Sequence, residues 1–361
     1  MTTVARPRLG YTLRRVHPAA TAQALIRGSI RDEAWVRPAL LGVTALAAVI
    51  YVWNLTVNGY ANTYYSAAAL AASKDWAAWF FGSIDASNFI TVDKPPLSTM
   101  IMGLSVRAFG LSSWSILLPE ALMGVASVLV LYRAVRRSFG AAAGLIAALV
   151  LAVTPVAALM FRFDNPDALL TLLLVSAAWA FLKALEDGRL RWVIVAAALV
   201  GFGFLTKYLQ AYLVLPAFIF TYAIAAPGSW RRRLGHLSVA GAVVLVSSGW
   251  WVAIVEAIPA SMRPFIGGST NNSVLDLIFG YDGLGRIFGG SGGQGAPAGG
   301  GGGSVVRLAS CGSPTPSSRR RSRGCSRSPA WRWSAGCSSA VARRGPIVPA
   351  PATSCGACGS A

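Results

Sequence analysis

An adjacent acid and base come first among the residues that could do chemistry. Asp93 and Lys94 are followed at once by Pro95 and Pro96. Two consecutive prolines restrict the backbone directly after this pair, so both charged side chains would be held in place at the level of the lipid headgroups. The element is a candidate site, and the competing interpretation is a solvated ion pair in a loop.

A second candidate is the six-residue turn from Arg162 to Asp167, which carries three charges between two apolar runs. Charges at the point where helices leave a membrane are costly unless they meet a partner or a water-filled cavity. Asp167, with Pro166 beside it, could cap the following helix. Capping does not account for Arg162 or Asp164, so both stay candidates.

The third candidate is Lys207, which ends the stretch Leu205-Thr206-Lys207 at the outer end of a predicted span. A lysine on the translocated side of a membrane opposes the usual distribution of positive residues. A negatively charged partner, such as a lipid phosphate, would explain it. A lysine that snorkels to the membrane surface is the alternative.

The composition indicates which elements position these residues. The chain has 361 residues, of which 55% are hydrophobic and 12% are charged, and its mean hydropathy is +0.56. A soluble domain carries roughly 25% charged residues. So few charges could not cover the surface of a soluble protein, and the sequence therefore predicts a polytopic membrane protein.

The net charge of +19 has two separate sources. Residues 1–303 hold 23 Lys and Arg against 13 Asp and Glu, whereas residues 304–361 hold nine Arg and no acid. All five cysteines also lie after position 304. This abrupt change is typical of a GC-rich gene read out of frame, so we expect residues 304–361 to be a frameshifted, disordered, low-complexity tail. The charge therefore does not indicate a nucleic-acid partner.

Seven apolar runs are close to the length of about 20 residues that a membrane-spanning helix requires. They cover residues 39–57, 114–133, 140–160, 168–185, 192–206, 208–226 and 236–257. Residues 97–112 are also apolar, but this segment is short and carries Arg107. We expect an interfacial or re-entrant helix there, because counting it as a span would place the arginines that follow on the outside.

The basic residues of the short loops predict the orientation, since such residues favour the cytoplasmic side. With seven spans, three basic clusters share that side: Arg133/Arg136/Arg137, Lys183/Arg189/Arg191 and Arg231/Arg232/Arg233. The loop 58–113 and the segments 162–167 and 258–303 then lie on the extracytoplasmic side of the cell membrane. All three candidate elements are expected on this side.

The fold class that follows is all-α: a polytopic transmembrane helical bundle whose long first extracytoplasmic loop carries interfacial helices. Residues 1–37 are expected to form a cytoplasmic leader. Residues 38–257 form the seven-span domain with the outer loop 58–113, and residues 258–303 form an outer glycine-rich loop.

The three elements, in this order and on this side, resemble one family. Asp93-Lys94-Pro95-Pro96-Leu97, the pattern Arg-x-x-x-Pro-Asp at 162–167 and Leu205-Thr206-Lys207 are similar to motifs of the GT-C glycosyltransferases. The relevant members are aminoarabinose transferase and the protein O-mannosyltransferases, which are of the glycosyltransferase family 39 type. The resemblance extends over residues 39–290.

This resemblance implies transfer of a sugar, mannose or a related hexose, with inversion at the sugar carbon. The donor would be a polyprenyl-phosphate sugar, and the acceptor a lipid, glycan or protein at the outer face. Lys94, Lys207 and Arg162 would hold the donor phosphate, whose growing charge fixed cations can stabilise. Asp164 and the side chains of Asn62 and Tyr65, at the start of the first outer loop, complete the expected substrate contacts.

The catalytic base is expected among Asp93, Asp85 and Asp167, because a carboxylate can accept the proton of an acceptor hydroxyl. Relatives often begin the first loop with Asp-Glu before a Tyr, but Ala61 and Asn62 stand there in this chain. Neither can take a proton, so Asp85 or Asp93 would have to serve. No cofactor is required by the sequence, although Asp93 could also help to bind a divalent cation.

Two other functions stay open at this point. The same charges could line the pathway of a non-catalytic transporter or lipid-handling protein. Transporters usually place ionisable residues in mid-span and show internal repeats, whereas here the charges gather at one interface. The chain could also be an inactive, truncated transferase.

Overall fold

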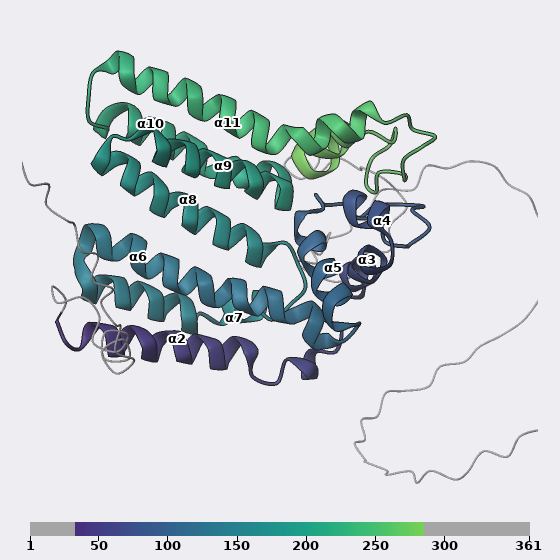
Figure 1. Ribbon diagram of the computed structural model, residues 1–361, viewed down its shortest axis with the longest axis horizontal. Helices are drawn as coiled ribbons and strands as arrows, with labels where there is room; N and C mark the ends of the chain where they lie inside the picture. The colour runs from purple at the N-terminus through teal and green to yellow at the C-terminus, as the bar shows by residue number, and fades with distance from the viewer. Residues whose placement is uncertain (1–32, 285–361) are drawn as a thin grey trace, which may run out of the picture. The chain divides into compact units, whose positions relative to one another are not determined.

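The computed structural model describes residues 33–284, and this part of the chain is helical without a β-strand. The helices, in chain order, are α2 (Val36–Val52), η1 (Leu55–Asn58), α3 (Thr63–Lys74), α4 (Trp76–Phe81), α5 (Leu97–Phe109), α6 (Ser113–Val153), α7 (Pro155–Met160), α8 (Asp167–Asp187), α9 (Leu190–Lys207), η2 (Tyr208–Val214), α10 (Leu215–Ala225), α11 (Trp230–Ala257), α12 (Val274–Asp276) and η3 (Leu277–Leu284). In Figure 1 the long helices α2, α6, α8, α9 and α11 lie side by side, and α3, α4 and α5 gather at one end of them.

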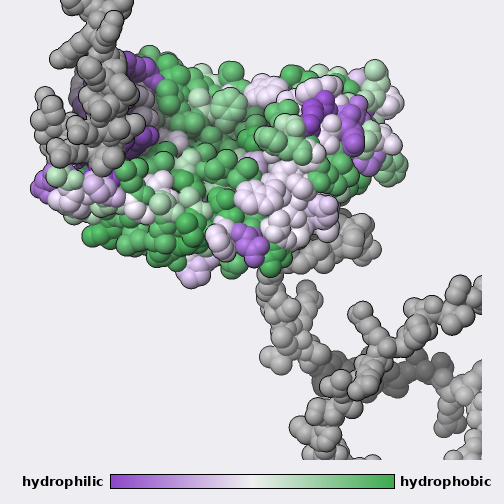
Figure 2. All heavy atoms as spheres, turned by 60° about the horizontal axis from the view of Figure 1, so that its bottom comes forward, coloured by the Kyte–Doolittle hydropathy of each residue, from purple (hydrophilic) through white to green (hydrophobic). Residues whose placement is uncertain are grey.

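Five stretches of the described chain are long and apolar enough to cross a membrane: Val36–Asn58, Ser113–Val153, Asp167–Asp187, Leu190–Ala225 and Trp230–Ala257. Figure 2 shows one face of this part, where hydrophobic residues cover most of the middle and hydrophilic residues gather toward the ends. The prediction of an all-α, multi-pass helical bundle is confirmed.

The longest of these stretches, α6, reverses its direction at Gly140, whose φ of 86° and ψ of 175° are not helical. A Cβ atom at Gly144 would lie only 2.9 Å from the carbonyl oxygen of Tyr132. In a continuous helix, twelve residues would separate these positions by about 18 Å. The 41-residue stretch is therefore a hairpin of two apolar arms.

The stretch Leu190–Ala225 also contains a reversal, at Tyr208, which has a φ of 44° and a ψ of −132°. The rings of Phe204 and Tyr212 consequently stack with centroids 5.0 Å apart. Val193, near the start of α9, shares a buried cluster with Tyr222, near the end of α10. The five stretches thus contain seven apolar arms, the number that the sequence predicts, and the crossing of a membrane by each arm stays a prediction.

The apolar segment after the two prolines forms α5, which has 13 residues and would be about 20 Å long, shorter than the hydrocarbon core of a bilayer. It packs closely on α3, since a Cβ at Gly103 would lie 2.5 Å from the Cβ of Ala72. Asn62 caps the start of α3, and Asp75 caps the start of α4. These short helices form a layer at one end of the long ones (Figure 1).

The chain after α11 folds back onto this layer. Glu256 accepts hydrogen bonds from the Ser273 hydroxyl and the Val274 amide, each at 2.6 Å, and the Thr91 amide donates to the Phe265 carbonyl at 2.9 Å. Residues 258–284, which were expected to begin an outer glycine-rich loop, therefore form an ordered connection. The rest of that loop, most of the leader and the tail 304–361 lie outside the described residues.

The predicted basic clusters lie together at the opposite end, which we call the basic end. Arg137 pairs with Glu186, and Arg232 donates to the Gly188 carbonyl at 2.8 Å. These contacts join the turn inside α6, the turn between α8 and α9, and the start of α11. The end with α3, α4, α5 and residues 258–284 is called the site end below.

The packing of α6 yields a prediction about stability. A Cβ at Gly124 would lie 2.5 Å from the buried Phe161 ring, so Gly124→Ala should lower the free energy of unfolding by about 1–3 kcal/mol through overpacking. Gly42→Ala is the matched control, because a Cβ at this α2 position meets nothing within 4 Å. It should leave stability unchanged or raise it by up to about 1 kcal/mol. Unfolding in detergent micelles measures both, and equal stability of the two variants would contradict the packing described.

Candidate active site

Lys94 is the best-defined feature of the site end. Its ammonium lies 3.1 Å from an Asp93 carboxylate oxygen and 2.7 Å from Asp282 Oδ1. The Lys94 and Asp282 side chains are only 7% and 6% exposed, against 24% for Asp93. Buried charges of this kind require partners. The predicted acid and base are thus neighbours in space, and they share a third residue from far along the chain.

Pro95 and Pro96 give this cluster its local geometry. They lead directly into α5, with Pro96 at the N-cap position, so that the Asp93-Lys94 pair sits at the start of a packed helix. The Asp93 amide also donates to the Tyr64 hydroxyl at 3.1 Å. The acid and the base are therefore fixed from both sides, by α3 and by α5.

A second ion pair lies at the same end, where Lys207 Nζ is 2.5 Å from Asp167 Oδ1. Asp167 is in the first turn of α8, and Lys207 is the last residue of α9. Both side chains are part-exposed, at 30% and 18%. The second and third sequence elements therefore meet each other directly.

Tyr65 connects the two ion-pair groups. Burial raises the pKa of its hydroxyl, and the negative charges of Asp93, Asp282 and Asp167 raise it further. The Coulomb energy falls with distance, so these three carboxylates are among the charges near the Tyr65 hydroxyl. Both ion-pair groups therefore lie near Tyr65. Together they contain two lysines and three carboxylates. The cluster is anionic overall and holds a neutral phenol at its centre.

Asp164 is completely buried beside this cluster. It accepts hydrogen bonds from the Asn62 amide at 2.6 Å and lies 2.7 Å from the Ser66 hydroxyl. The Ser66 hydroxyl is also 2.7 Å from the Tyr60 carbonyl, and it has one proton to donate. The Ser66 hydroxyl donates to the Asp164 carboxyl, and burial raises the pKa of this carboxyl to about 6. Asp164 and Asn62 together fix the start of the first outer loop.

Two predicted residues are placed apart from the lysines. Arg162 donates to the Ile50 carbonyl at 2.6 Å and to the Asn54 carbonyl at 3.3 Å, which satisfies free carbonyls at the end of α2. Asp85 accepts from the Ser87 and Phe89 amides within its own loop. The structure thus does not bring Arg162 or Asp85 into contact with the ion-pair groups.

Asp282 and Tyr64 were not among the site residues predicted from the sequence. Asp282 lies in a segment that was expected to be a loop, and its pairing with Lys94 spans 188 residues. The one indication in the sequence that Asp282 could belong to a site was its charge, since Asp276 and Asp282 are the only acids of residues 258–303. The Tyr64 contact depends on the packing of α3 against the Asp93 backbone, which no spacing rule predicts.

A metal at Asp93 stays a prediction. Within residues 33–284 no three His, Cys, Asp or Glu side chains are grouped closely enough to hold an ion. Asp93 and Asp282 are two oxygen donors near each other, and Mg²⁺ can be held by one or two carboxylates together with substrate phosphates. The residues present would therefore suit a cation that binds with its substrate.

The burial of Lys94 leads to a second prediction. Lys94→Met should lower the free energy of unfolding by about 3 kcal/mol, because it leaves buried carboxylates without their cation. Lys94→Met/Asp282→Leu should recover part of this loss. Lys74→Met is the control, since Lys74 is exposed on α3, and its effect should stay within about 0.5 kcal/mol. Chemical unfolding in micelles tests all three variants, and a Lys94→Met protein as stable as Lys74→Met would contradict the buried ion cluster.

The raised pKa of Asp164 yields a prediction about pH. A carboxyl group whose pKa is raised from 3.8 to about 6 on folding stabilises the protein below its ordinary pKa, and this contribution is lost as the pH rises through 6. Between pH 5 and pH 7.5 the wild type should lose about 1 kcal/mol more than Asp164→Asn. Thermal unfolding at both pH values measures this difference. Parallel pH profiles for the two proteins would rule out a protonated Asp164.

Comparisons with known proteins identify a matching family and several relatives. Residues 93–251 match the family model described as dolichyl-phosphate-mannose-protein mannosyltransferase. YkcB of Bacillus subtilis, provisionally named a mannosyltransferase, is 44% identical over 260 residues, which are 72% of this chain and 36% of YkcB. YycA of the same organism, with the same provisional name, is 39% identical over 251 residues, 70% of this chain and 37% of YycA.

Among solved structures, ArnT from Cupriavidus metallidurans, in a crystal structure bound to undecaprenyl phosphate, is similar over 70% of this chain and 44% of that one. The TM-score is 0.49 at 21% identity. The chain spans little more than a third of the length of the two Bacillus relatives. The family match begins at Asp93 and includes Lys94, the 162–167 turn and Lys207. The chain belongs to the GT-C glycosyltransferases, the family that its three sequence elements resemble.

Proposed function

We propose that this chain transfers mannose or a related hexose from a polyprenyl-phosphate donor to an acceptor at the outer face of the membrane. The observation that carries the proposal is the Lys94 ammonium, held almost out of solvent between Asp93 and Asp282. The description of the matching family, which names a dolichyl-phosphate-mannose donor, supports the donor class. The names of YkcB and YycA support mannose.

The charges of the site suit the electronic demands of this reaction. The bond between the sugar carbon and the phosphate oxygen breaks, and a bond between that carbon and the acceptor oxygen forms with inversion. The polyprenyl phosphate leaves with one more negative charge than it had as a diester. Lys94 and Lys207 can stabilise this charge as it develops, which accelerates the reaction more than tight binding of the donor would.

Asp93 is the carboxylate best placed to take the acceptor proton. It is about four times more exposed than Asp282, at 24% against 6%, so an acceptor hydroxyl can reach it more easily. Asp167 is similarly exposed, at 30%, but it is paired at 2.5 Å with Lys207, whereas Asp93 lies 3.1 Å from a lysine that it shares with Asp282. Asp85 is bonded to its own loop. Loss of a general base typically costs about 10²–10⁴-fold in rate.

Donor binding would also prepare the base. At rest, both lysines are neutralised by carboxylates, so an incoming phosphate must compete for them. When the phosphate contacts Lys94, the hold of this lysine on Asp93 weakens. Asp93 is then freed to accept a proton at the moment when the donor is in place. This coupling gives a reason for an acid and a base adjacent in sequence.

The difference between the two ends of the bundle supports an outer location for the site. The basic end collects the arginines of the short turns, which favour the cytoplasmic side of a membrane. The ion-pair groups lie at the other end, with the layer of short helices α3, α4 and α5. An acceptor outside the cell would therefore meet Asp93 from the extracytoplasmic side.

The test uses membranes that contain this chain and a radiolabelled polyprenyl-phosphate mannose. Asp93→Asn should reduce label transfer at least 100-fold while donor binding persists, since the amide is isosteric but cannot accept the proton. Lys207→Met should weaken donor binding, as measured by photo-crosslinking. Lys74→Met removes the same charge from the same outer layer and should change transfer less than about twofold.

Full-length YkcB in the same membranes is the positive control. If YkcB transfers the label and this chain binds the donor without transferring it, the part of YkcB beyond the matched region is needed for transfer. If YkcB is active and this chain neither binds nor transfers the donor, the proposal is wrong. Transfer by the Asp93→Asn variant at the wild-type rate would reject Asp93 as the base.

A further inference from the structure

A cavity of about 370 Å³ lies at the basic end, on the far side of the bundle from the candidate active site. Residues of three helices line it: the start of α2, the middle of α6 and the second half of α8. Five of the lining side chains are basic, namely Arg37, Arg133, Arg136, Arg137 and Lys183. Among the described residues that line this cavity, none is acidic.

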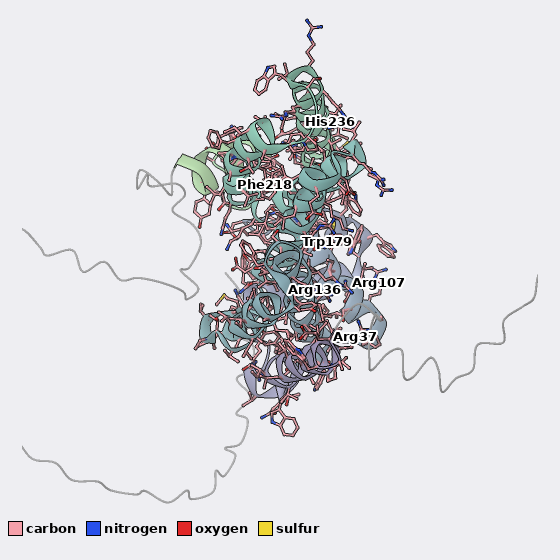
Figure 3. All side chains as sticks on the ribbon, turned by 90° about the vertical axis from the view of Figure 1, so that its left-hand side faces the viewer. Arg37, Arg107, Arg136, Trp179, Phe218 and His236 are labelled. Atoms are coloured by element: carbon pink, nitrogen blue, oxygen red, sulfur yellow. The ribbon has the colours of Figure 1, made fainter. Side chains whose placement is uncertain are left out.

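Figure 3 looks onto this end of the bundle, where Arg37, Arg136 and Trp179 lie on neighbouring helices. The cavity also has aliphatic walls, formed by Val36, Leu40 and Leu129. It therefore combines a cationic part with an apolar part. A ligand that fits it would carry a negative group and an adjoining apolar one.

The basic side chains are held in defined positions. The Lys183 ammonium lies 3.8 Å from the Trp179 ring centroid and 4.0 Å from that of Trp192. Arg136 donates to the Tyr132 hydroxyl at 2.9 Å, and Arg137 pairs with Glu186. Side chains that are already positioned lose less entropy when they bind an anion. Their arrangement differs from that of freely moving surface lysines.

Positive charges converge on this cavity. The charges of Arg137 and Arg133 act against that of Lys183, and Asp187 opposes them. The described residues that line the cavity include five cations and no carboxylate, so the lining is positively charged. An anion bound among them would relieve this repulsion, and arginine binds phosphate oxygens through parallel hydrogen bonds.

We propose that this cavity is a binding site for a phosphate group, supplied by the headgroup of an anionic membrane lipid. The site is independent of sugar transfer, because it lies at the opposite end of the bundle from Lys94. Basic pockets between transmembrane helices on the cytoplasmic side are suited to anionic headgroups. The aliphatic walls favour a lipid over a soluble phosphate compound, which has nothing to place against them. A lipid held there would join α2, α6 and α8.

The test compares two charge-matched double variants of the full chain. Arg133→Gln/Lys183→Gln removes two cations that line the cavity. Arg189→Gln/Arg231→Gln removes two exposed cations from the same end, outside the cavity. Each purified protein is placed in nanodiscs of phosphatidylcholine with added phosphatidylglycerol, and native mass spectrometry counts the phosphatidylglycerol that remains bound after extraction. Loss of the two lining cations should weaken retention by about 30-fold, and the control pair should retain lipid as the wild type does.

A third variant fills the cavity without changing any charge. Leu129→Trp should also lose bound phosphatidylglycerol, and circular dichroism with size-exclusion chromatography verifies that each variant is folded. Inorganic phosphate is the soluble probe: a failure to displace the lipid supports a headgroup ligand. Displacement by inorganic phosphate that depends on Arg133 and Lys183 supports a phosphate site with a soluble ligand instead. Equal retention by the two double variants, or wild-type retention by Leu129→Trp, would overturn the proposal.

Discussion

The site end is organised by one requirement, which is that a nearly buried ammonium must have anionic partners. Lys94 meets Asp93 beside it and Asp282, which is 188 residues further along the chain. For Asp282 to arrive there, the chain must leave α11 and return across the site end. Glu256 begins this return by capping α12, and the contact between Thr91 and Phe265 fixes it against the first outer loop. A buried pair broken on one side is strongly destabilising, so this single contact constrains much of the outer layer.

The helical framework was predictable because it depends on composition and local breaks. A hydrocarbon environment requires long apolar helices, which hydropathy detects directly. The helices break at Gly140 and Tyr208, because the backbone angles of these two residues are not helical. The shortness of α5 was also visible in the sequence. The helical stretch Ser113–Val153 is long enough to be counted as one span, but the basic cluster Arg133/Arg136/Arg137 just before Gly140 marks the reversal between its two apolar arms in the sequence.

The candidate site was predictable only in part, for an equally physical reason. The spacing of Asp93, Lys94 and two prolines identified a held acid and base, and the charges of the 162–167 turn identified a second group. The spacing of charged residues in the sequence does not show which of them lie in the site and which stabilise the fold. Arg162 closes the end of α2, and Asp164 is buried, where it accepts hydrogen bonds from the Asn62 amide and the Ser66 hydroxyl. The pairing of Asp282 with Lys94 could not be predicted, because it depends on the tertiary contacts of residues 258–284, and the charge of Asp282 alone does not identify its partner.

The balance of charge at the site end has a consequence for the proposed reaction. Two lysines among three carboxylates make the resting site anionic, so it does not attract a phosphate by net charge. The proposed polyprenyl-phosphate donor would instead reach the headgroup level by lateral diffusion in the membrane, and its phosphate would exchange with the carboxylates that already hold the lysines. Each exchange costs little, because one ionic contact replaces another in the same low-dielectric setting. A site of this kind would discriminate against soluble phosphates and release a carboxylate only when the lipid donor is bound. Because Asp93 and Lys94 are adjacent, binding of the donor phosphate by Lys94 and release of the Asp93 carboxylate would occur in one step.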